Sequence, residues 1–101
     1  MATITLSDIL DDIYAAEQGL HKFERRYWSS SDHFHELYTQ GLLDDGQNSE
    51  DFAEWAGHYK LKQKREAALQ QISSRRMATL RQGGQGEAIR LMPAEPTHEP
   101  G

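Results

Sequence analysis

Apolar residues in the first quarter of the chain recur at alternating intervals of three and four positions, and this spacing is the strongest constraint on the fold. It places every member on one narrow stripe of an α-helix, which is typical of a helix that packs along another helix. A helix is therefore predicted over about residues 6–28, with Thr5 or Ser7 as its N-cap. Gly19 interrupts the pattern, and we favour a tolerated helix-propensity cost there over a close approach by a neighbouring backbone. The stripe comprises Leu6, Ile9, Ile13, Ala16, Leu20, Phe23 and Tyr27.

A short second helix is predicted next. Residues 29–32 are serines and an aspartate, the residue types that cap helices, so they can end the first helix and begin another. Apolar residues then recur three and four positions apart, and Gly41 stands where a helix C-terminal glycine belongs. This helix covers about 31–40, and we expect Leu42 and Leu43 after it to plug the end of the core.

A long third helix is predicted over about 49–82, capped by Asn48 or Ser49, and its apolar pattern changes halfway. At 3.6 residues per turn, the aromatic face of its first half continues into polar positions. The apolar stripe of the second half falls on roughly the opposite side, so we expect it to point away from the core toward a partner or a second copy. The alternative is a sparse stripe that bends around the bundle. The first face is Phe52, Trp55, Ala56 and Tyr59, and the second stripe is Leu61, Ala68, Leu69 and Ile72.

These elements predict an all-α protein: an antiparallel helical hairpin of two long helices with a short intervening helix over residues 1–82, and a disordered C-terminal tail over 83–101. Proline and glycine oppose regular structure in the tail. Its apolar cluster at 88–92 is alternatively a short motif that docks on a partner. The expected core is Ile9, Ile13, Leu20, Phe23, Phe34, Leu37, Phe52, Trp55 and Tyr59.

Composition narrows the class of protein. The chain has no cysteine, which excludes disulfides and thiolate chemistry, and no apolar run approaches the roughly 18 residues of a membrane span. We expect a cytoplasmic protein without a membrane segment. Hydrophobic residues make up 37% of the chain, below the roughly 45–50% of an average domain. A large self-contained core is therefore not expected, which favours dependence on a partner.

Charge is distributed unevenly along the chain. Residues 1–59 hold 3 basic and 12 acidic side chains, whereas residues 60–81 hold 7 basic and 1 acidic. A basic arm of this kind can contact nucleic-acid phosphates or an acidic protein surface. It can also pair within the chain, with Arg75 and Arg76 facing Asp8, Asp11 and Asp12.

No constellation of catalytic residues is visible, so we expect no enzymatic activity, no cofactor and no metal. Glu17 and His21, like Glu54 and His58, are spaced i, i+4, and two such helices could present four metal ligands. The Glu-x-x-His spacing of ferritin-like carboxylate sites is absent, and solvated surface pairs are the favoured interpretation. The tryptophans and most tyrosines are interpreted as core and rim aromatics: Trp28, Trp55, Tyr14, Tyr27, Tyr38 and Tyr59.

A pattern of aromatic, capping and acidic residues runs through the first two thirds of the chain. It comprises Phe23, Tyr27, Ser29-Ser30-Ser31-Asp32, Phe34, Tyr38, Gly41-Leu42-Leu43-Asp44-Asp45, Asp51-Phe52-Ala53-Glu54-Trp55-Ala56-Gly57 and Tyr59. This pattern resembles a group of small all-helical prokaryotic proteins that are often antitoxin-like partners in toxin–antitoxin gene pairs. The resemblance spans about residues 6–65 and implies an all-α module that binds and neutralises a toxin without catalysis. The most specific part is the helix start at 52–57.

The leading hypothesis is a non-catalytic protein–protein interaction module, an antitoxin-like partner of a small toxin. Self-association is a further use of the same surface, and a nucleic-acid-associated accessory protein is the alternative. No membrane partner is expected. The predicted partner-binding residues are Leu61, Lys62, Arg65, Ala68, Leu69, Ile72 and Arg76 on the third helix, and Ile89, Arg90, Leu91 and Met92 in the tail.

Overall fold

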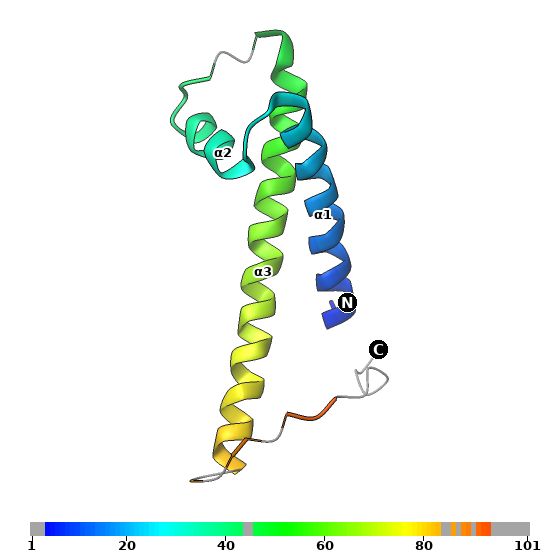
Figure 1. Cartoon of the computed structure of the whole chain (residues 1–101), viewed down its shortest axis with the longest axis vertical. Helices are drawn as coiled ribbons and strands as arrows, with labels where there is room; N and C mark the ends of the chain where they lie inside the picture. Colours follow the sequence, from blue (N-terminus) through cyan, green and yellow to red (C-terminus); the bar gives the residue numbers. More distant parts are fainter. Residues whose placement is uncertain (1–3, 44–45, 84–85, 87, 90, 94–101) are drawn as a thin grey trace.

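A computed structural model describes residues 4–43, 46–83, 86, 88–89 and 91–93 of the chain, and within these residues all regular structure is helical. Helices α1 (Leu6–Tyr27) and α3 (Ser49–Gly83) run antiparallel, and α2 (Ser31–Thr39) lies beside one end of the pair (Figure 1). A 3₁₀ turn, η1 (Gly46–Asn48), leads into α3. The predicted all-α hairpin is confirmed, and the predicted helix bounds hold to within one residue.

The two ends of the hairpin differ in construction. We call the end that carries α2, η1 and the connecting loops the closed end. At the opposite, open end, α1 begins at Leu6 while α3 runs on to Gly83 (Figure 1). Along the part of the chain described, no helix has both the length and the apolarity needed to cross a bilayer.

Sequence-encoded caps set the helix boundaries. Thr5 is the N-cap of α1: its hydroxyl accepts a hydrogen bond from the Asp8 amide, and the Asp8 carboxylate accepts one from the Thr5 amide. Ser30 caps α2 by accepting from the His33 amide. Gly41 follows α2 with a φ of 69°, the left-handed conformation that glycine adopts readily.

The core is concentrated at the closed end and is aromatic. Six of the nine predicted core residues are buried, and the structure adds Ala16 and Ala56. Ile13 and Tyr59 are half-buried, and the prediction is wrong for Leu37, which is 40% exposed because the short α2 buries only one face. Of the two leucines expected to plug the core, Leu43 packs against it and Leu42 is exposed. The buried apolar set is Ile9, Ala16, Leu20, Phe23, Phe34, Phe52, Trp55 and Ala56.

The apolar stripe in the second half of α3 was predicted to point away from α1, and this prediction is wrong. Three of its four residues, Leu61, Ala68 and Leu69, are half-buried. Half-buried positions continue down α3 at intervals of three and four, through Lys62, Arg65 and Leu69, although a strict 3.6-residue extrapolation leads to polar positions. The α1 stripe repeats every 3.5 residues, slightly less than the 3.6 residues of a helical turn. A helix that stays in contact with this stripe must also use positions 3.5 residues apart on average, so its contact face rotates slowly around the helix. This rotation brings Leu61 and Ala68, on the same side of α3 as Arg65, into partial burial.

Gly19 is a place of close approach, contrary to the predicted tolerated cost. A Cβ atom added there would lie 2.5 Å from the Cδ2 and Nε2 atoms of His58 on α3. The neighbour is a side chain and not the backbone. Glycine at this position therefore makes room for the His58 ring, which lies 30% exposed between the two helices.

Candidate partner-binding site

Two of the predicted partner-binding residues on α3 are engaged by α1. The Arg65 Nε atom donates to the Asp12 carboxylate at 2.8 Å, and the Lys62 Nζ atom lies 3.6 Å from a Glu17 carboxylate oxygen. The predicted intramolecular pairing of the basic arm therefore occurs, but earlier in α3 than Arg75 and Arg76. These two cations therefore link α3 to α1 in the middle of the hairpin.

The remaining predicted residues lie toward the open end. Leu61, Ala68 and Leu69 are half-buried, and Ile72 is 37% exposed. Ile72 begins the stretch of α3 that outruns α1.

The tail contributes accessible apolar side chains near this stretch. Arg76 donates to the Met92 carbonyl oxygen at 2.6 Å, which places the tail beside α3. Ile89, Leu91 and Met92 are all at least 45% exposed. Arg90, the last of the predicted tail residues, lies outside the described residues.

At the closed end, a buried hydrogen-bond chain positions α2 against both long helices. The Glu24 carboxylate of α1 accepts from the Ser31 amide at 3.0 Å and from the Ser31 hydroxyl at 2.7 Å. The Ser31 hydroxyl in turn accepts from Trp55 Nε1 of α3 at 2.9 Å. Ser31 is the buried polar residue of the described core. The Glu24 carboxylate, the Ser31 amide and hydroxyl and the Trp55 indole nitrogen each have a hydrogen-bond partner within this network. The first residue of α2 is thereby fixed to α1 and α3 together.

The Glu24 carboxylate also meets the His21 ring at 2.8 Å. Burial acts to raise the pKa of Glu24, but the hydrogen bonds from His21 and Ser31 together outweigh it and hold that pKa below its ordinary value.

Two phenols flank the same region. Hydrogen bonds to Asp51 and Asp32 raise the pKa values of Tyr27 and Tyr59, respectively, because each bond stabilises the neutral phenol beside a carboxylate.

Stacked aromatic rings fill the space between the three helices. Phe34 of α2 lies parallel to Trp55 of α3, with ring centroids 3.9 Å apart. Phe23 and Tyr27 of α1 stack on the same indole at 5.7 and 5.6 Å. Trp55 is therefore the common contact of α1, α2 and α3 and is only 1% exposed.

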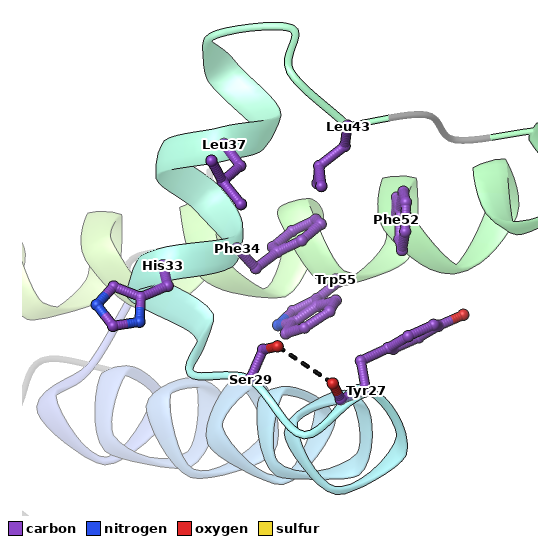
Figure 2. A pocket seen from close by; sticks show the side chains of 8 residues that line it. All are labelled: Tyr27, Ser29, His33, Phe34, Leu37, Leu43, Phe52 and Trp55. Carbon is purple, nitrogen blue, oxygen red and sulfur yellow. Dashed lines mark hydrogen bonds between the residues drawn. The ribbon is translucent and has the colours of Figure 1, made fainter.

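This aromatic cluster forms the floor of an apolar pocket of about 180 Å³ that opens to the surface. Phe34, Leu37, Leu43, Phe52 and Trp55 supply its walls from α2, the following loop and α3 (Figure 2). Tyr27, Ser29 and His33 complete the lining, and the His33 ring points away from the apolar walls (Figure 2). The pocket is thus suited to an apolar group entering from the surface.

Trp28, between two lining residues in the sequence, is the least expected feature of the closed end. It is the C-cap of α1, with a φ of 55° in the left-handed region, and its side chain is 95% exposed. The left-handed conformation costs a residue with a Cβ atom roughly 1–2 kcal/mol. Its predicted role as a core or rim aromatic is wrong, as it is for Tyr14, which is 65% exposed. Neither a favourable backbone conformation nor packing in the core explains a tryptophan at position 28.

The two Glu–His pairs, interpreted from the sequence as solvated surface pairs rather than metal ligands, do not form a common site among the described residues. Glu17 pairs with Lys62, whereas the Glu54 carboxylate meets the His58 ring and Lys22 on another part of the surface. A polar pocket of about 100 Å³ beside the start of α2 includes Glu17, but no cluster of three potential metal ligands occurs among the described residues.

Sequence reasoning missed the closed-end site because each of its parts has an ordinary local explanation. Aromatic residues in helices are expected to be buried, and a serine run is expected to cap. One signal was available: Trp28 directly precedes the capping serines, where a helix C-terminus favours glycine in the left-handed conformation. A tryptophan at that position is unusual enough to raise the question of function.

Comparison with known proteins adds no relative: the chain matches no protein family, and no curated protein or solved structure gives a significant match.

Proposed function

We propose that this chain is a non-catalytic interaction module that binds a protein partner at its closed end, and that the partner is a small toxin that the chain neutralises in the cytoplasm. The observation that carries the proposal is Trp28, a 95% exposed tryptophan in a strained conformation, whose two neighbours in the sequence, Tyr27 and Ser29, line an open apolar pocket. Large aromatic side chains next to pockets are the commonest energetic centres of protein interfaces.

Exposed leucines extend the apolar surface around the pocket. Leu37 is 40% exposed and lines the pocket, and Leu42, 66% exposed, belongs to the loop that follows α2. Exposed apolar side chains at a pocket and in the loop next to it favour an interaction site at this end of the molecule. An apolar side chain of the partner would enter the pocket, with Trp28 packing beside it.

The charge of the closed end suggests the chemistry of the partner. Helix α2 carries Asp32 and Glu36 and no lysine or arginine, and Glu50 lies in the first turn of α3. Arg25 and Arg26 end α1 at the same end, and Arg26 pairs with Asp51, so the acidic surface is that of α2 and Glu50. A partner surface that combines an apolar anchor with surrounding lysine or arginine side chains would complement it.

The resemblance to antitoxin-like proteins supports the toxin as the specific partner. Its residues are largely those that build the closed end: the residues of the Trp55 stack, the capping serines before α2 and the start of α3. The resemblance therefore falls on the same surface as Trp28 and the pocket.

The test is a growth assay with the products of the genes adjacent to this one. We expect one of them to arrest growth when expressed alone, and co-expression of this chain to restore growth through a complex of defined stoichiometry. Trp28→Gly should abolish rescue and weaken binding by at least about tenfold, the usual loss at an interface centre. The variant should remain folded, because glycine adopts the left-handed conformation freely.

The matched control is Tyr14→Ala, which removes an exposed aromatic residue from the open half of α1. It should leave rescue and binding unchanged. Full rescue by Trp28→Gly would overturn the closed-end site. Binding without growth arrest by any neighbouring product would retain the interaction module but overturn the toxin as its partner.

A nucleic-acid role is the second candidate, supported by three arginines and no carboxylate in residues 73–83 of α3. Salt bridges to α1 already engage Lys62 and Arg65, which reduces the number of cations available to phosphates. Titration with mixed DNA and RNA at low salt tests this candidate. Binding with a steep salt dependence would support it, and no binding at low salt would eliminate it.

A further inference from the structure

The open end of the hairpin carries a helix without a helical partner. Contacts between Phe23 and Trp55, and between Asp12 and Arg65, fix the antiparallel register of α1 and α3. Continued along both helices, this register places the start of α1 opposite about residue 72 of α3. Residues 73–83, which we call the overhang, therefore extend beyond α1 (Figure 1).

Apolar side chains are exposed where α1 begins. Leu6, Leu10 and Tyr14 follow one another at intervals of four residues and are 37%, 47% and 65% exposed. They share one side of α1, next to its contact with α3. Ile72, the residue immediately before the overhang, is 37% exposed. The open end thus combines a stretch of α3 that no other described helix covers, with the tail beside it at Arg76, and an exposed apolar stripe on α1.

The two uncovered surfaces carry opposite charge. Asp11 lies three residues before Tyr14 and is exposed, whereas Arg75 and Arg81 are exposed on the overhang. None of these three side chains bonds to another described residue. The overhang has no carboxylate, and Asp8 adds negative charge near Asp11, whereas Asp12 is paired with Arg65.

We propose that a second copy of this chain covers the open end, with the overhang of each copy lying along the start of α1 of the other. The arrangement has two-fold symmetry, so the same pair of surfaces meets twice. The lengths are similar: at a rise of 1.5 Å per residue, residues 73 to 83 span about 15 Å and Leu6 to Tyr14 about 12 Å.

Charge decides between this arrangement and direct pairing of the two overhangs, which would bring six arginines together without a carboxylate. Crossed packing instead places each basic overhang on an acidic α1 start. Since the closed ends then lie at opposite ends of the dimer, the inference stands independently of the proposed toxin binding.

The test is the oligomeric state of the full chain by analytical ultracentrifugation at about 100 µM, since exposed pairs of this kind give weak, salt-screened association. A dimer at low salt that dissociates in 0.5 M salt is expected. The double variant Arg75→Glu/Arg81→Glu and the single variant Asp11→Arg should each be monomeric, with dissociation constants raised at least about tenfold.

Mixing these two variants gives the decisive result. In the mixed dimer, glutamates of one overhang face the arginine at position 11, and arginines of the other face the native Asp11, so both contacts are again complementary. We therefore expect a one-to-one heterodimer from two monomeric variants. Arg25→Glu/Lys60→Glu is the matched control: it makes the same charge change away from the open end and should leave the dimer intact.

Three outcomes would overturn the proposal. They are a wild-type chain that remains monomeric at low salt, charge-reversed variants that still dimerise, and variants whose mixture fails to associate. Helical circular dichroism of each variant establishes that the chain is folded when its association is measured.

Discussion

The closed and open ends of this hairpin are built from the same two helices but are held together differently. At the closed end, α1, α2 and α3 converge on Trp55, whose ring stacks on three aromatics and whose indole nitrogen donates to Ser31. Toward the open end, salt bridges from Arg65 and Lys62 accompany a thinner apolar contact, and the last turns of α3 extend past the start of α1, with the tail beside them. The difference indicates that stability resides at one end and uncovered helix surface at the other.

The sharpest test of this difference is to remove one apolar side chain from each end. Phe23→Ala should lower the free energy of unfolding by about 3–5 kcal/mol, because Phe23 is fully buried and its neighbours cannot close the cavity. Ile72→Ala should cost less than about 1 kcal/mol in the monomer, because its side chain is already partly exposed. Urea unfolding of both variants at equal concentration measures the two losses. Equal losses would contradict the asymmetry.

A smaller effect is expected from the polar chain at the closed end. Ser31→Ala removes the acceptor of Trp55 Nε1 and a donor to Glu24, leaving buried polar atoms without partners. We expect a loss of about 1–3 kcal/mol of unfolding free energy. Ser29→Ala is the control, since Ser29 is exposed and its hydroxyl bonds only to the nearby Tyr27 carbonyl. A Ser31→Ala variant as stable as the control would mean that the chain of hydrogen bonds contributes nothing.

The middle of the hairpin provides a test of about 1 kcal/mol. Gly19→Ala alone should gain no stability, because the new methyl group displaces the His58 ring from its contact with Glu54 and Phe23. In a His58→Ala background the same change should stabilise by about 1 kcal/mol, the ordinary helix-propensity gain of alanine over glycine. Thermal unfolding of the four members of this cycle measures the coupling. Additive effects would show that Gly19 does not serve the His58 contact.

The sequence predicts the helices well because their signals are local. The α1 stripe, Thr5 as one of two predicted caps and the serines before α2 each act within one turn of chain. The direction of the apolar stripe in the second half of α3 was predicted wrongly, because it depends on a contact between two helices: the 3.5-residue repeat of α1 determines which positions of α3 face it. The exposure of Trp28 and the pocket were not predicted for a related reason: whether an aromatic side chain is buried depends on whether a second element covers it.

The smallest expected effect is the pH dependence that Glu24 brings to the closed end. Its pKa is lowered in the folded protein from an ordinary value of 4.5, so the folded state favours the carboxylate more than the unfolded chain does. The resulting stabilisation is fully present above that ordinary value and is lost as the pH falls through the lowered pKa. Unfolding free energies measured between pH 3 and pH 7 should therefore fall more steeply toward acid in the wild type than in Glu24→Gln. Glu50→Gln, at an exposed position of α3, should keep the wild-type slope. If Glu24→Gln also keeps it, the carboxylate that joins His21 to Ser31 does not contribute to the acid sensitivity of the fold, and the closed end depends on its aromatic stack alone.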